Sequence, residues 1–214
     1  MDNTRPEPAR QHETAQTALV LLLHRADAEH VALGLVRAWS PTVPTAILTT
    51  LRVAEEDGAE QAWKGVVGRL GQTGIDPSRL VLAGIDGAQQ AALRLAFGPD
   101  ALGCAGVLAC GDIFLPLAAL AGPSSPGRPK LRLVWTADDP LVSAAAPGDL
   151  LHCLRVAGLD AQGAVLPGAA LRAAEAGSGP GALLVRLAGA YLAELVAVAL
   201  GGASWPRGSP ARTG

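Results

Sequence analysis

Short hydrophobic runs alternate along the chain with longer segments in which apolar residues recur at helical spacing. The runs are almost uninterrupted, which is typical of parallel strands covered by helices on both faces. This alternation predicts a three-layer α/β fold with a mostly parallel sheet and helices on both faces. The expected strands are 17–23, 45–50, 79–84, 105–110, 131–136 and 161–167. The expected helices are 27–38, 56–72, 87–97, 149–157 and 181–200.

The two ends of the chain lack this pattern. Residues 1–16 are polar and contain no apolar run of the kind found in a signal peptide, so we expect a disordered lead-in. Residues 201–214 are rich in glycine, proline and serine, which predicts a disordered tail. The segment between them, 17–200, is expected to form one domain, because 214 residues suit a single domain of moderate size.

The amino-acid composition indicates which classes of partner the protein is expected to bind and in which cellular compartment it is expected to lie. The formal net charge is -2 and no basic cluster occurs, which argues against nucleic-acid binding. The cysteines Cys104, Cys110 and Cys153 are odd in number and form no C-x-x-C pair, so a disulfide framework is not expected. Two of them lie in or beside an apolar run, where cysteine usually packs as a small core residue. A reducing cytoplasm fits this usage.

Residues 181–200 form an apolar segment long enough to span a bilayer. Arg186 and Glu194 interrupt it, and at 100° per residue they lie about 80° apart around a helix. We therefore expect a packed terminal helix in which one solvent-exposed stripe carries both charged residues, and we expect no membrane span.

The most informative local pattern is a turn between an expected strand and an expected helix. Gly84-Ile85-Asp86-Gly87-Ala88 places small residues on both sides of one polar side chain. This is the geometry of a nucleophile elbow, a strained turn that raises one side chain above the sheet. The residue after the nucleophile, here Gly87, supplies an oxyanion-hole N–H in such a turn. That N–H survives any change of side chain, so it can still bind a carbonyl or carboxylate.

The run Gly74-Ile75-Asp76-Pro77-Ser78-Arg79-Leu80, followed by this elbow, resembles the phospholipase/carboxylesterase family of small α/β hydrolases, the acyl-protein-thioesterase-like group. The segment 135–142, WTADDPLV, resembles the loop that carries the acid of the family, which would be Asp139. The segment 165–171, VLPGAAL, resembles the one that carries the histidine. The resemblance covers residues 17–200 in the same order, and it implies an α/β-hydrolase fold.

The chain departs from the family pattern at the positions that perform catalysis. Asp86 stands where the family has serine, and Leu171 stands where it has histidine. The loop that follows the first strand keeps His24, continues with Arg25 and lacks the glycines that normally follow. By resemblance, Gly87, His24 and Arg25 are the candidate oxyanion and ligand-binding residues. The resemblance thus predicts a degenerate member without a conventional triad.

Asp86 has two interpretations. Some α/β hydrolases use an aspartate in the elbow as a nucleophile, and a histidine-activated water then hydrolyses the ester that forms. Without the histidine the ester should persist. Alternatively Asp86 is vestigial and caps the following helix. Asp139 is either the remaining acid or an ordinary turn residue. These two carboxylates have no third ligand in view, so we expect no metal and no cofactor.

The histidines give little prospect of a replacement base. His12 lies in the lead-in, His30 on a helix and His152 mid-helix in an outer layer. His24 ends the first strand and is the best candidate. The favoured function is binding, of a small acyl or other apolar ligand or of a protein partner. The alternatives are an active hydrolase that uses Asp86, and a structural or assembly protein that forms a homodimer.

Overall fold

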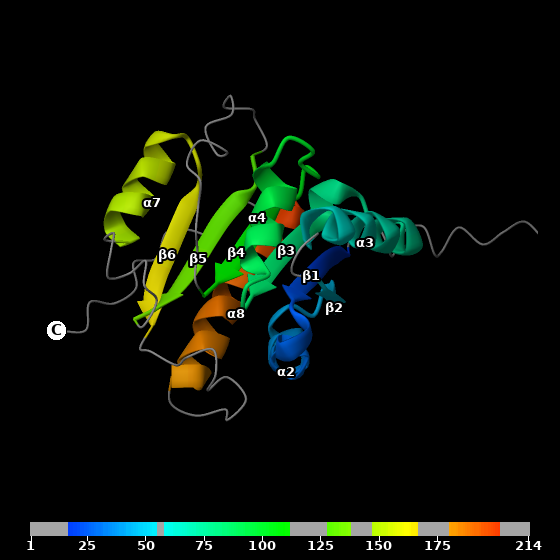
Figure 1. Ribbon diagram of the computed structural model, residues 1–214, viewed down its shortest axis with the longest axis horizontal. Coiled ribbons are helices and arrows are strands. Elements are labelled where there is room, and N and C mark those ends of the chain that lie inside the picture. Colours follow the sequence, from blue (N-terminus) through cyan, green and yellow to red (C-terminus); the bar gives the residue numbers. More distant parts are fainter. Residues whose placement is uncertain (1–16, 55–57, 112–127, 138–146, 167–179, 202–214) are drawn as a thin grey trace, which may run out of the picture.

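The computed structural model describes residues 17–54, 58–111, 128–137, 147–166 and 180–201. Its centre is a six-stranded sheet in the order β2-β1-β3-β4-β5-β6, and every pairing between neighbours is parallel. The strand arrows therefore point to one edge of the sheet (Figure 1). The strands are β1 (Ala18–His24), β2 (Ala46–Arg52), β3 (Leu80–Ile85), β4 (Gly106–Cys110), β5 (Lys130–Thr136) and β6 (Ala161–Leu166).

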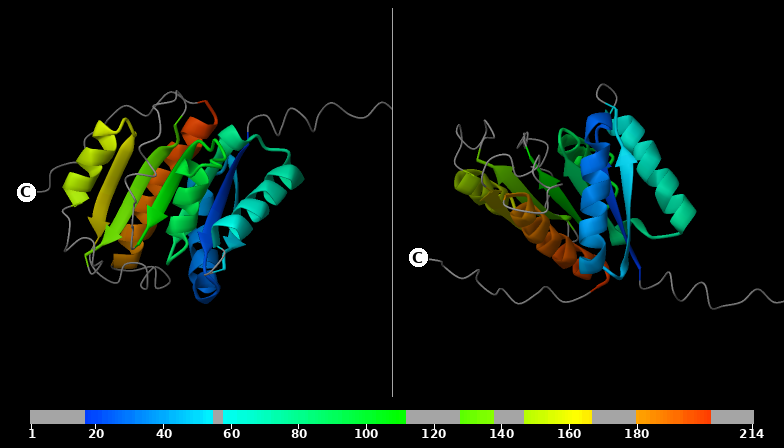
Figure 2. Two further views of the ribbon diagram at one scale, coloured as in Figure 1. Left: turned by 45° about the horizontal axis from the view of Figure 1, so that its top comes forward. Right: turned by 90° about the horizontal axis from the view of Figure 1, so that it is seen from below.

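Helices cover both faces of the sheet, which makes three layers (Figures 1 and 2). Helices α2 (Glu29–Trp39) and α8 (Pro180–Ala199) pack on one face. Helices α3 (Gly58–Thr73), α4 (Gln89–Phe97) and α7 (Pro147–Val156) pack on the other. Within the described residues, short 3-10 helices lie in three of the connections: η1 (Ala26–Ala28), η2 (Ser40–Thr42) and η3 (Pro77–Arg79). This architecture confirms the predicted three-layer α/β fold.

The alternation of side chains along each strand divides the core into two clusters. In β1, Leu19, Leu21 and Leu23 face α3 and α4, whereas Val20 and Leu22 face α2 and α8. All five side chains are fully buried, because β1 has a paired strand on each side and helices on both faces. This double burial explains why the strands appear in the sequence as nearly continuous apolar runs.

All six strands and all five helices predicted from the sequence are present, with ends that differ by at most a few residues. The GIDPS run, residues 74–78, leads the chain into β3. The Asp76 carboxylate accepts hydrogen bonds from the Ser78 N–H (2.8 Å) and the Ser78 hydroxyl (2.6 Å), which caps η3. These bonds hold the pKa of Asp76 below its ordinary value. The predicted lead-in and nearly all of the predicted tail lie outside the described residues.

Helix α8 has the length and mean hydropathy, 1.8 over Gly181–Ala199, of a helix that crosses a membrane. It is instead a core helix, because Leu184, Ala188, Leu192 and Leu195 are fully buried against the sheet. The prediction of a solvent-exposed stripe is wrong for one of the two charged residues. Arg186 is exposed, but Glu194 faces the sheet and binds a buried arginine.

The three cysteines are free thiols. Cys104 and Cys110 are buried, as predicted, and Cys153 is exposed on α7. Burial raises the pKa of the Cys104 and Cys110 thiols to about 12, because a thiolate would lose its hydration there.

Candidate functional site

The strand order creates a switch point between β1 and β3. From β1 the chain crosses through α2 to β2, and from β3 it crosses through α4 to β4 on the other side. The two helices cover opposite faces of the sheet (Figure 2). In open α/β sheets, ligands bind outside the carboxyl ends of the strands at such a point. The residues that follow β1 and β3 are therefore the first place to seek a site.

The turn after β3 has the backbone of an elbow. Asp86 adopts φ +46°, and among the described residues it is the only non-glycine with positive φ. A side chain on Gly84 would place its Cβ 2.5 Å from Gln89 Cα, so the strand and helix approach too closely for any larger residue. The Asp86 side chain is exposed. The predicted helix cap is wrong: α4 has Ala88 at its N-cap position, and no side chain caps it.

Arg25, which follows β1, lies directly against the elbow. A Cβ on Gly87 would lie 2.6 Å from Arg25 Cδ and 3.2 Å from Arg25 Nη1. Gly87 has φ +87°, so both its backbone and its surroundings require glycine. The contact joins two residues that are 62 positions apart, because β1 and β3 are neighbours. Two of the candidate binding residues, Arg25 and Gly87, are thereby brought together.

His24, the third candidate, is almost fully buried at the end of β1, with 2% exposure. Its ring Nδ1 donates a hydrogen bond to the Arg25 carbonyl oxygen at 2.8 Å. The imidazole thus holds the backbone of the loop that carries Arg25. His30 and His152 are exposed on α2 and α7.

A cleft of about 670 Å³ opens beside Arg25. It lies across the ends of β1 and β2, which are neighbours in the sheet, with His24 opposite Arg52. Among the described residues, its lining carries two guanidinium groups and one carboxylate, together with an amide side chain and small apolar residues: Arg25, Ala26, Asp27, Arg52, Val53, Ala54 and Gln61. Arg25 therefore belongs both to the cleft and to the contact with the elbow.

Hydrogen bonds connect the strand ends that border the cleft to each other and to α3. The Val53 N–H donates to the His24 carbonyl oxygen at 2.9 Å, and the Ala54 N–H donates to the Gln61 side-chain oxygen at 3.2 Å. Arg25 Nε lies 3.6 Å from Asp27 Oδ1, and both side chains are substantially exposed. An ion pair so long and so exposed contributes little binding energy. Arg52 was not singled out from the sequence, because the strand expected there, 45–50, ended two residues before it, whereas β2 ends at Arg52.

Asp139 and Leu171, the predicted acid and the predicted lost histidine position, lie outside the described residues. Within the described part of the chain, no group of three or more His, Cys, Asp or Glu side chains could hold a metal ion. Within the described part of the chain, the candidate site at the switch point comprises Asp86, Gly87, Arg25 and the adjoining cleft.

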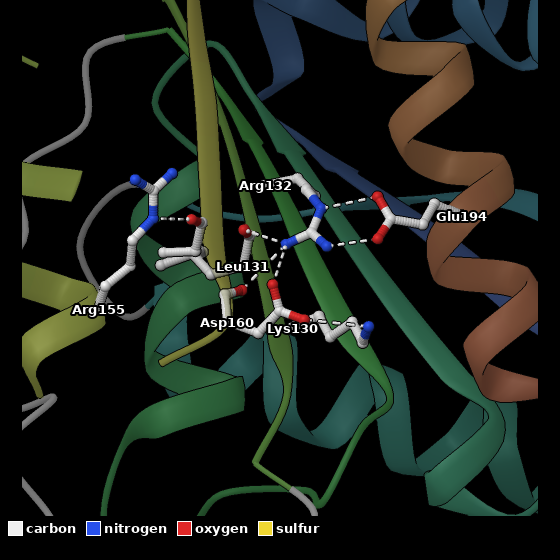
Figure 3. A network of polar contacts seen from close by, with 7 residues as sticks. Lys130, Leu131, Arg132, Arg155, Asp160 and Glu194 are labelled. Atoms are coloured by element: carbon white, nitrogen blue, oxygen red, sulfur yellow. Dashed lines mark hydrogen bonds and ion pairs between the residues drawn. The ribbon is translucent and has the colours of Figure 1, made fainter. Parts of the chain in front are cut away.

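Sequence analysis also missed a polar network in the core (Figure 3). Arg132 on β5 is fully buried, and its guanidinium donates to both carboxylate oxygens of Glu194 on α8. Nη1 also donates to the Asp160 carbonyl oxygen (3.0 Å) and carboxylate (3.2 Å). Lys130 lies 3.0 Å from the same carboxylate. The network sits at the amino ends of β5 and β6, opposite the edge that carries the elbow. A charged residue inside a buried strand was the signal that could have revealed it.

No protein-family model matches the sequence, and no curated protein does. Several solved structures are similar in fold. Esterase PE8 has a TM-score of 0.57 and 19% identity, over 83% of this chain and 92% of the esterase. Esterase LipW from Mycobacterium marinum has a TM-score of 0.55 and 17% identity, over 85% and 74%. A phospholipase/carboxylesterase from Dyadobacter fermentans DSM 18053 has a TM-score of 0.51 and 14% identity, over 73% and 83%. The chain thus has the α/β-hydrolase fold of these esterases.

Proposed function

From this shared hydrolase fold, we propose that the protein binds a small acyl compound at the switch point and does not perform conventional triad catalysis. One observation carries the proposal: the elbow keeps its strained backbone, but Asp86 occupies its apex. A protonated or ionised carboxylate is a much weaker acyl nucleophile than a histidine-activated serine. The sequence resemblance also puts Leu171 at the position of the histidine.

Two hydrogen-bond donors at the elbow support the binding of an acyl ligand, whereas catalysis by a conventional triad lacks such support. Among the described residues, the Gly87 N–H has no hydrogen-bond acceptor, and Gly87 is exposed. The guanidinium of Arg25 lies next to it. An acyl oxygen that enters the site would meet these donors even with no nucleophile present. The cytoplasmic location and the homodimer or protein partner stay predictions.

A titration with butyramide, a neutral acyl compound, tests the binding. We expect saturable shifts of the Arg25 and Gly87 amide signals in nuclear magnetic resonance spectra. The amide of Cys153, which lies on α7 at the far end of the sheet, serves as the control and should not shift. If no acyl compound shifts any signal, the binding function is wrong, and the structural or assembly role is favoured.

A second candidate function is acyl transfer to Asp86, because its exposed carboxylate lies at the position of a nucleophile in the elbow. In that case the carboxylate would attack the electrophilic carbon of an ester, expel the alcohol as its anion and leave the acyl group on Asp86. Intact mass after incubation with p-nitrophenyl butyrate detects this adduct. A mass gain of one acyl group that disappears in Asp86→Asn would favour the nucleophile. An unmodified mass supports the binding function.

A further inference from the structure

Strand β2 forms one edge of the sheet, and its backbone presents hydrogen-bonding groups to the outside (Figure 1). The Thr45 carbonyl and the Val53 N–H both bond to β1, and successive residues of a strand direct these groups to opposite sides. The N–H and carbonyl groups of Leu48 and Thr50 therefore point away from the sheet, and among the described residues they have no partner. Such a row of groups is a template for pairing with a further strand.

β2 lacks the features that usually prevent such pairing, which are charges, prolines and bulges along an edge strand. Its residues, AILTTLR, contain no proline or glycine, and the charged Arg52 stands at the very end. Its register with β1 continues without a bulge along the whole strand. Ile47, in the first half of the strand, is 45% exposed. The edge is thus both apolar and open to a partner strand.

Helix α2 carries an exposed stripe beside this edge. Glu29, Leu33 and Arg37 are all exposed and follow one another at intervals of four residues, so they lie along one side of the helix. In a right-handed crossover from β1 through α2 to β2, this side faces away from α8 and toward the edge (Figure 2). Val31, about 200° around the helix from Leu33, packs against the core. The stripe has an apolar centre and opposite charges at its two ends.

The strand and the stripe are self-complementary about a two-fold axis perpendicular to the sheet. We propose that two copies of the chain pair antiparallel through β2, so that their two sheets become one. With Thr49 on the axis, Leu48 of each copy exchanges backbone hydrogen bonds with Thr50 of the other. Ile47 of each copy then packs on Leu51 of the other, on the face that α3 covers.

The same axis brings the two α2 helices side by side on one face of the joined sheet. They run antiparallel, so Leu33 of one copy meets Leu33 of the other, and Glu29 of each copy meets Arg37 of the other. This charge complementarity identifies a second copy of the chain as the occupant of the edge. The inference is independent of the proposed acyl binding, because none of these residues belongs to the elbow or lines the cleft.

Sedimentation equilibrium of the full chain over a dilution series measures the dissociation constant of the dimer. We expect the wild type to form a species of twice the mass of one chain. Ile47→Lys should raise the dissociation constant at least about thirtyfold, as for a central interface residue. Val165→Lys is the matched control, because Val165 is 43% exposed on β6, the opposite edge of the sheet. It should dimerise as the wild type does, and circular dichroism should show that both variants are folded.

Exchange of the two charges on α2 tests the symmetry. Glu29→Arg and Arg37→Glu should each weaken the dimer about tenfold, because each brings like charges together. The double variant Glu29→Arg/Arg37→Glu should restore the wild-type dissociation constant. A mixture of the two single variants should form a heterodimer, since each then meets opposite charges in the other. These positions are exposed on a helix, so they test the inference even if Ile47→Lys does not fold.

A wild type that stays monomeric at the highest concentration would overturn the inference, as would a dimer that a folded Ile47→Lys leaves intact. Loss of the dimer in Val165→Lys alone would place the interface at β6 and also overturn it. Single charge variants that weaken the dimer with no recovery in the double variant would contradict the antiparallel axis. Each of these results leaves the acyl-binding function standing, because the butyramide titration tests that function separately.

Discussion

Arg132 and Glu194 form a bidentate ion pair that joins the sheet to the terminal helix. Arg132 Nη2 lies 2.5 Å from Glu194 Oε1, and Nε lies 2.9 Å from Oε2. The arginine side chain is fully buried and that of the glutamate is 20% exposed. Removal of one partner from a buried pair leaves the other charge without compensation. This pair therefore adds a charged link between α8 and β5 to the apolar packing of the helix on the sheet.

We expect Glu194→Gln to lower the free energy of unfolding by about 3 kcal/mol, because Arg132 keeps its charge and loses its main partner. Urea denaturation followed by circular dichroism measures the loss. Arg186→Gln is the matched control on the same helix, and its effect should be within about 0.5 kcal/mol. The double variant Arg132→Met/Glu194→Leu should recover most of the loss, since apolar side chains can replace a buried pair. Equal effects of Glu194→Gln and Arg186→Gln would contradict this account.

The same network predicts that the stability of the protein depends on pH in the acidic range. Burial acts to raise the pKa of Asp160, but the Lys130 hydrogen bond and the Arg132 charge outweigh it, so the folded pKa lies below the ordinary 3.8. A carboxylate with a depressed folded pKa stabilises the protein fully above its unfolded pKa. This contribution decreases as the pH falls below about 4 toward the lower folded pKa.

Asp160→Asn should remove that part of the acid dependence. We expect wild-type protein to lose stability relative to Asp160→Asn between neutral pH and about pH 3. Urea denaturation at a series of pH values measures the difference between the two. The effect should be modest, because the Asp160 side chain is 49% exposed and water screens its charges. A difference that stays constant with pH would show that Asp160 titrates normally.

The elbow predicts a large difference between two glycine substitutions. Gly84→Ala places a Cβ 2.5 Å from Gln89 Cα and 2.8 Å from Gln89 N, which are backbone atoms that cannot move aside easily. We expect a loss of about 2–3 kcal/mol, as for other overpacked core sites. Gly34→Ala on α2 meets nothing within 4 Å and should stabilise the protein by about 0.5–1 kcal/mol. Thermal unfolding of both variants measures this. Similar midpoints would show that strand and helix are not packed closely at the elbow.

The sequence patterns predicted the helices and strands because each of these elements depends mainly on the residues within its own segment. Strands such as β3, buried on both faces, need apolar residues at every position, and its run Leu80–Ile85 has them. Even the edge strand β2, which is only partly buried, keeps enough apolar residues to be recognised. The elbow was predictable for the same reason, since small residues flank a single turn.

The contacts between distant residues were not predictable in this way. The approach of Arg25 to Gly87 depends on β1 and β3 being neighbours, and local hydrophobic periodicity does not determine strand order. The position of Glu194 depends on which side of α8 meets the sheet. Helical periodicity places Glu194 near Arg186 around the helix, but it does not show that a buried arginine on β5 attracts one of them.

The most direct test of the central claim is the hydrolysis of p-nitrophenyl acetate and butyrate by the wild type and by Asp86→Asn. We predict that the rates equal the buffer rate for both proteins, because Asp86 is no effective acyl nucleophile without a base. Turnover well above buffer in the wild type that disappears in Asp86→Asn would contradict the account and make the elbow a catalytic site.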